Sequence, residues 1–85
     1  MKYFSSKKFD KQFTKLPEKI KNQYIERIQI FVQDPNDIIL NNHSVHYLYE
    51  GCRSINISGD VRALYEMVDD TALFVRIGTH SELYK

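Results

Sequence analysis

The chain has little cysteine and no long apolar run, and both absences limit what it can be. Cys52 is the single cysteine, so no internal disulfide can form. No apolar run approaches the roughly 18 residues that a membrane span needs, and the first residues lack the apolar segment of a secretion signal. No repeat, linker or low-complexity segment divides the sequence. We therefore expect one soluble, cytoplasmic domain over residues 1–85, with no membrane partner.

Net charge is also nearly absent. Twelve basic and 11 acidic side chains leave a formal charge of +1. That balance neither demands nor excludes a nucleic-acid partner, because the clustering of cations matters more than their number. The hydrophobic fraction of 42% argues against disorder. A chain of this size buries only about 60–65% of its unfolded surface, so we expect modest stability.

The first half of the chain predicts a short strand over residues 2–5 and then two helices. Ser6 suits the N-cap of the first helix, and apolar residues recur behind it at Phe9, Phe13 and Leu16. Pro17 ends this pattern and is expected in the first turn of the second helix. The second helix has an apolar stripe and runs to the turn signal that begins at Asp34. The stripe consists of Ile20, Tyr24, Ile25, Ile28, Phe31 and Val32.

The second half predicts strands, because β-branched and aromatic residues alternate with polar ones between turn clusters. The expected strands cover residues 47–49, 52–58, 61–68 and 72–77. Residues 58–60 and 69–71 are the expected hairpin turns, and residues 41–46 are expected to form a loop. The prediction is an α+β fold in which two N-terminal helices pack on one face of a small, mainly antiparallel β-sheet.

Cations and titratable groups gather at the strand ends and in the C-terminal tail, which suggests a site for a phosphate-bearing ligand. These residues are Asp60, Arg62, Arg76, His80 and Tyr84. Arg62 lies just past a turn, where a half-buried cation needs an anionic partner. That partner is either a carboxylate, from Asp60 or Glu66, or a ligand phosphate held by two hydrogen bonds.

Two other interpretations of these residues stay open. His43, His46, His80 and Asp60 offer the ligand types of a metal site, but the loop spacing is weak evidence for one, and His46 is expected to be an exposed polar residue. Arginines within strands often cover only a solvated face. Cys52 is expected to be a small core residue without a catalytic role.

Two segments together resemble a known family. GDVRALYE, followed by a strand and then RIGTHSELYK, is similar to the YafQ-like branch of the RelE/ParE toxin superfamily. The matching positions are Gly59, Asp60, Arg62, Tyr65, Ile77, Gly78, Thr79, His80, Leu83 and Tyr84. The Asn42–His43 pair and the step from Gly51 to Arg53 also fit, so that the resemblance covers nearly the whole chain.

The resemblance implies a type II toxin that enters the ribosome, cuts mRNA there and is neutralised by a cognate antitoxin. It implies metal-independent chemistry and no cofactor. His80 would be the leading acid or base, His43 and Asp60 would handle or orient protons, and Arg62 would stabilise the phosphate. Tyr84 would pack near the cleaved nucleotide. The implied RNA-binding residues are Arg53, Asn56 and Arg76.

The resemblance also leaves an alternative. Asn56 aligns with a position where YafQ-like enzymes carry another histidine, and asparagine cannot shuttle a proton at neutral pH. The ParE branch of the same superfamily poisons DNA gyrase, so the fold alone does not determine the target. A non-catalytic or ParE-like toxin that binds a protein target is therefore the second hypothesis.

Overall fold

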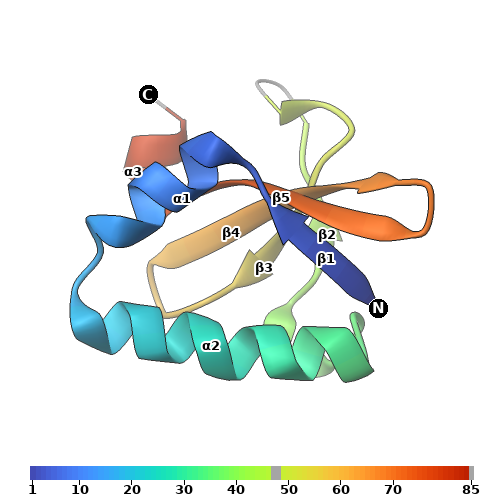
Figure 1. Cartoon of the computed structure of the whole chain (residues 1–85), viewed down its shortest axis with the longest axis horizontal. Helices are drawn as coiled ribbons and strands as arrows, with labels where there is room; N and C mark the ends of the chain where they lie inside the picture. The colour runs from blue at the N-terminus through green and yellow to red at the C-terminus, as the bar shows by residue number, and fades with distance from the viewer. Residues whose placement is uncertain (47–48, 85) are drawn as a thin grey trace.

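The computed structural model describes residues 1–46 and 49–84, and its central feature is a five-stranded sheet in the order β1-β5-β4-β3-β2 (Figure 1). The elements are, in chain order, β1 (Lys2–Ser5), α1 (Lys7–Thr14), α2 (Glu18–Gln33), the 3-10 turn η1 (Ile38–Leu40), β2 (His43–Ser44), β3 (Arg53–Asn56), β4 (Val61–Val68), β5 (Thr71–Thr79) and α3 (His80–Leu83). Strand β1 pairs with β5 in parallel, and every other pairing is antiparallel. The predicted α+β fold is confirmed.

The helices cover one face of the sheet, which we call the helix face. Phe74 of β5 lies at its centre and contacts the rings of Phe9, Tyr24, Phe31 and Tyr65, with centroid distances between 5.2 and 6.2 Å. Phe74 is fully buried. The predicted apolar faces of both helices therefore pack on the sheet, as α2 does along its lower side in Figure 1.

The opposite side, here the outer face, follows from the strand register, since laterally paired residues point to the same side of a sheet. One row across the outer face holds His43, Ser54, Leu64 and Arg76. A second row, nearer the start of β4, holds Asn56, Arg62 and Gly78. Four of the eight predicted site residues, His43, Asn56, Arg62 and Arg76, therefore share this face.

Helix α1 closes the part of β5 that β1 leaves unpaired. The Ser6 backbone N–H donates to the Phe74 carbonyl at 2.9 Å, and the Ile77 N–H donates to Gln12 Oε1 at 2.9 Å. Ser6 Oγ also accepts from the Phe9 N–H at 3.0 Å, which confirms Ser6 as the predicted N-cap. The backbone of Ser6 and the side chain of Gln12 thus make the hydrogen bonds to β5 that a neighbouring strand would otherwise make.

Several predicted boundaries were wrong. Residues 43–44 form a strand instead of a loop, and two residues are too few to show an alternating pattern. The strand predicted over 52–58 is shorter, because the Ile57 and Ser58 N–H groups both donate to the Val61 carbonyl in the hairpin turn. Pro17 precedes the second helix as its N-cap residue.

The strand predicted over residues 47–49 lies mainly on two residues, 47 and 48, that fall outside the described part of the chain, while Tyr49 lies in a 3-10 turn. The expected polar tail is the short helix α3. Within residues 1–46 and 49–84, no helix has the length and apolar character that crossing a bilayer requires.

Candidate active site

The Gly-Thr-His segment builds the start of α3. Thr79 Oγ1 accepts from the Glu82 N–H at 3.2 Å, and Glu82 Oε1 accepts from the Thr79 N–H at 2.8 Å, which is a capping box. A Cβ on Gly78 would lie 3.1 Å from Glu82 Oε1, so glycine leaves room for that carboxylate. His80 follows as the first residue of the helix and is exposed. The motif therefore fixes the backbone that presents His80.

Removing the cap should loosen α3 alone. We expect Thr79→Ala to cost about 1 kcal/mol locally, because the Glu82 N–H loses its acceptor. The Tyr84 N–H, which donates to the His80 carbonyl at 3.0 Å, should then exchange about fivefold faster with solvent deuterium, as followed by NMR. Thr79→Ser keeps the hydroxyl and should exchange like the wild type. Unchanged exchange in Thr79→Ala would show that the cap does not hold α3.

His80 lies at the edge of an aromatic cluster formed by Tyr49 and Tyr84. Its ring lies 4.8 Å from the ring of Tyr84, one turn further along α3, and Tyr84 meets Tyr49 edge-to-face at 5.5 Å. The Tyr49 hydroxyl donates to the Leu83 carbonyl at 2.8 Å, and the Arg76 guanidinium lies 6.0 Å from the Tyr49 ring centre. Tyr49, to which the sequence analysis assigned no role in the site, thus connects Arg76 to the histidine through Tyr84.

Asp60, Arg62 and His80 meet at one end of the β4–β5 ladder. Val61 pairs with Thr79 in the last rung, so Asp60, in the turn before β4, and His80, at the start of α3, are the residues that directly flank this rung. Arg62 pairs with Gly78 one rung inside. The structure therefore brings together an exposed carboxylate, a half-buried guanidinium and an exposed imidazole that are far apart in the sequence.

Backbone carbonyls of the hairpin turn hold the Arg62 guanidinium. Its Nη1 donates to Ser58 O at 3.0 Å and to Val61 O at 3.2 Å, and its Nη2 donates to Gly59 O at 3.4 Å. These carbonyls orient the side chain but carry no net charge to neutralise it. Two partners were expected from sequence, a carboxylate or a phosphate. Within residues 1–46 and 49–84 the hydrogen bonds of Arg62 go to these carbonyls and not to a carboxylate, which leaves its charge for an anionic ligand.

Asn56 lies beside Arg62 in the same row of the outer face. Among the described residues, its buried Oδ1 has no hydrogen-bond partner. An unsatisfied buried amide oxygen is costly, and the described residues hold one other, Gln23 Oε1 on α2. The position of Asn56 beside Arg62 distinguishes it from Gln23. Asn56 therefore belongs to the same group as Asp60, Arg62 and His80.

His43 lies away from this group, on the edge strand β2. Its Nδ1 is 2.8 Å from the carbonyl of Asn41, whose left-handed backbone (φ 47°) turns that carbonyl toward the ring. A carbonyl can only accept, so Nδ1 carries a proton and donates to it, while Nε2 is left for a ligand. Strands β2 and β5 are three strand spacings apart, about 14 Å. The structure does not bring His43 to His80.

Arg53 faces the helix side of the sheet and joins a polar network there. Its Nε donates to Asn42 Oδ1 at 2.7 Å, and Asn42 Nδ2 donates to the Tyr65 hydroxyl at 2.7 Å. Arg53 also pairs with Tyr65 across the β3–β4 ladder. Arg53 therefore holds Asn42, in the segment before β2. It lies on the opposite face of the sheet from Asn56 and Arg76.

Burial raises the pKa of the Tyr84 phenol, and Tyr49 raises it further, so the phenol stays a neutral donor at physiological pH. Burial also raises the pKa of the Cys52 thiol; Glu66 adds to this increase and Arg76 opposes it.

In the described part of the chain, no three histidine, cysteine or carboxylate side chains are grouped so as to hold a metal ion.

The buried Cys52 thiol should react slowly. We expect a thiol reagent at pH 8 to modify the folded protein at least about tenfold more slowly than the protein in denaturing urea, because burial blocks access and the raised pKa reduces the thiolate. The rate is followed by the absorbance of the released product. Equal rates in both conditions would contradict the buried position.

Comparisons with known proteins agree with this architecture. A family model described as ParE toxin of type II toxin-antitoxin system, parDE, matches residues 3–84. The structure of YafQ from E. coli superposes with a TM-score of 0.82 at 20% identity, covering 98% of this chain and 97% of that one. A copper-bound mutant toxin from Helicobacter pylori superposes at 0.72 with 26% identity, covering 99% of each chain.

Two further comparisons complete the assignment. The toxin in the E. coli DinJ-YafQ toxin-antitoxin complex superposes with a TM-score of 0.75 at 22% identity, covering 98% of this chain and 96% of that one. No curated protein matches the chain. The chain belongs to the ParE toxin family of type II toxin–antitoxin systems, within the RelE/ParE superfamily, and its fold is that of YafQ.

Proposed function

We propose that the chain is a ribosome-dependent mRNA endoribonuclease that inhibits translation. The observation that carries the proposal is the gathering of Asp60, Arg62, Asn56 and His80 at one end of the outer face. Proton-transfer groups and an arginine whose charge is not neutralised are what RNA cleavage through the 2′-hydroxyl needs.

In this proposal the 2′-oxygen attacks the adjacent phosphorus, and the bond from phosphorus to the 5′-oxygen breaks. Asp60 and His80 divide the two proton transfers: one accepts the 2′-hydroxyl proton, and the other supplies a proton to the 5′-oxygen. Both groups are exposed, and they flank the Val61–Thr79 pair that ends the β4–β5 ladder. The products are a 2′,3′-cyclic phosphate and a 5′-hydroxyl.

Arg62 and Tyr84 assist without exchanging protons in the reaction. Two Nη nitrogens anchored on turn carbonyls keep the Arg62 guanidinium in place, where it stabilises charge on the non-bridging oxygens. Tyr84, neutral and half-buried against His80, offers a ring face on which the nucleotide stacks. Arg76, held near Tyr49, contacts the RNA backbone from the next row.

His43 has a different role in the proposal from the one expected from sequence. A group about 14 Å from the β5 strand does not reach the phosphorus on which His80 acts. His43 instead meets the RNA strand beyond the cleaved nucleotide, through its Nε2.

The net charge of the chain is only +1, which gives little overall attraction to RNA. The first part of the chain nevertheless carries a run of lysines, most of them exposed, that suit sequence-independent contacts to ribosomal RNA phosphates. These lysines are Lys7, Lys8, Lys11, Lys15, Lys19 and Lys21. The partners in this proposal are therefore the ribosome with its mRNA, and a cognate antitoxin such as the one in the DinJ-YafQ complex.

The family match favours one second candidate, a toxin that acts by binding a protein target. The matching model is that of ParE toxins, and Asn56 takes the place of a histidine that YafQ-like enzymes carry. A toxin of this kind would arrest growth without cutting mRNA.

Primer extension on an mRNA, with and without translating ribosomes, separates the two candidates. The nuclease proposal expects new primer-extension stops, which mark the 5′ end of the downstream fragment, only when both the chain and ribosomes are present. It expects these stops also at EDTA concentrations that leave the ribosomes intact. A folded protein that arrests growth but leaves the mRNA whole would overturn the nuclease proposal in favour of the protein-binding candidate.

A further inference from the structure

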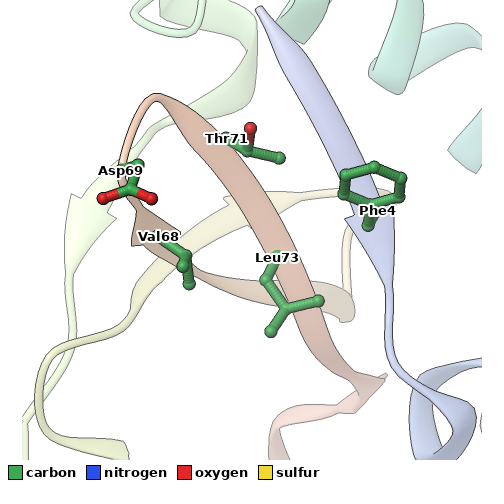
Figure 2. A pocket seen from close by; sticks show the side chains of 5 residues that line it. All are labelled: Phe4, Val68, Asp69, Thr71 and Leu73. Carbon is green, nitrogen blue, oxygen red and sulfur yellow. The ribbon is translucent and has the colours of Figure 1, made fainter.

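A second feature of the outer face lies at the opposite end of β4 from the active site. It is an apolar pocket of about 290 Å³ lined by Phe4, Val68, Asp69, Thr71 and Leu73, which Figure 2 shows between β1 and the β4–β5 hairpin. We call it the hairpin pocket. Val68 is seven residues along β4 from Val61, about 23 Å at the rise of a strand.

The strand register explains why these apolar side chains meet. Phe4 pairs with Leu73 across the β1–β5 ladder, and Val68 pairs with Thr71 across β4–β5. Thr71 and Leu73 alternate along β5 with Ala72 and Phe74, which point into the core, so they face outward, and so do their partners Val68 and Phe4. Phe4 is 67% exposed and Val68 is 49% exposed. Apolar groups this exposed, gathered around one hollow, are typical of an interaction surface.

The rim of the hairpin pocket is acidic. Asp69 and Asp70 form the hairpin turn, and Glu66 pairs with Leu73 on the same face. Lys2, opposite Thr71, is the cation that the register places among these three acids. Excess negative charge around an apolar hollow repels RNA phosphates and favours a polypeptide with basic side chains.

We propose that the hairpin pocket binds an amphipathic segment of the cognate antitoxin. An aliphatic side chain of that segment fills the hollow beside Phe4 and Leu73, and flanking lysines or arginines meet Asp69 and Asp70. The inference rests on the proposed toxin–antitoxin function. The pocket is remote from His80, so antitoxin binding and RNA cleavage should respond to different substitutions.

The test measures the Kd of the antitoxin for toxin variants by calorimetry. The probe is the protein encoded in the same operon as the chain, purified separately. Phe4→Ser combined with Val68→Ser should weaken binding at least about 30-fold, as removal of central apolar anchors does, and should leave ribosome-dependent cleavage unchanged. The matched control is Ile38→Ser, which changes an isoleucine that is 93% exposed outside the pocket and should leave the Kd unchanged.

A second variant tests the charges without removing apolar surface. Asp69 has a left-handed backbone (φ 58°), which asparagine also tolerates, so Asp69→Asn with Asp70→Asn removes two charges and keeps the turn. We expect binding about threefold to tenfold weaker at low salt, with a smaller difference at high salt.

The outcomes separate this inference from the proposed function. If the probe binds and neutralises the wild type but binds the pocket variant equally well, the pocket inference alone is overturned. If the probe binds no form of the chain, the antitoxin part of the proposed function falls with it, while the primer-extension result still stands by itself. If the pocket variant only converts a dimer into a monomer in sedimentation, the pocket joins two copies of the chain and the inference is wrong.

Discussion

Replacing His80 with alanine is expected to lower the rate of ribosome-dependent mRNA cleavage by at least about 100-fold, the usual contribution of a positioned acid or base. His80 is exposed, and in the described part of the chain its ring packs against a single aromatic ring, that of Tyr84. The free energy of unfolding should therefore change by less than about 1 kcal/mol. Single-turnover cleavage on stalled ribosomes gives the rate, and urea denaturation gives the stability.

His46→Ala is the matched control, because His46 is also exposed but lies in the segment after β2, outside the group at the end of β4. It should cleave at the wild-type rate. Wild-type cleavage by a folded His80→Ala protein would remove His80 from the mechanism, and equal losses in both variants would point to a general effect of the substitution.

Replacing Phe74 with alanine is expected to lower the free energy of unfolding by about 3–5 kcal/mol. Its ring is fully buried and contacts five aromatic rings among the described residues, the fifth being Tyr3 at 6.2 Å. Truncation removes these contacts and leaves a cavity that the rigid strand β5 cannot close. A domain of this size has a total stability on the order of 4–13 kcal/mol, so a large part of it would be lost.

Phe4→Ala is the matched control for Phe74, since Phe4 lies on the neighbouring strand with most of its ring in solvent. Its free energy of unfolding should stay within about 0.5 kcal/mol of the wild type. Urea denaturation followed by far-ultraviolet circular dichroism measures both variants. Similar losses at the two positions would contradict the division into helix face and outer face.

The sequence predicted the elements whose patterns are long. The first helix and strand 61–68 were predicted closely, because Phe9 and Phe13 recur at helical spacing and β4 has turn residues at both ends. The resemblance also pointed to Asp60, Arg62 and His80 before the register showed them at one end of the sheet. The motif predicted this grouping because the three residues belong to one β4–β5 hairpin or directly flank it.

The sequence did not predict the contacts that depend on distant segments. Strand β2 is two residues long and has no local pattern, so the position of His43 at the sheet edge had no signal. The bond from Asn42 to Tyr65 joins residues 23 positions apart, and it explains why Arg53 faces the helices. The contact of Tyr49 with Tyr84 likewise exists only after α3 folds back toward residues 49–52.

The most direct test of the nuclease account is the chemistry of the cut itself. The measurement is wild-type cleavage on the ribosome of an mRNA that carries a single 2′-deoxynucleotide on the 5′ side of the mapped cut, beside the all-ribose mRNA. The account predicts a 2′,3′-cyclic phosphate and a 5′-hydroxyl from the all-ribose mRNA, and no cut at the deoxy position. Cleavage at the deoxy position, or a product with a 5′-phosphate, would contradict it.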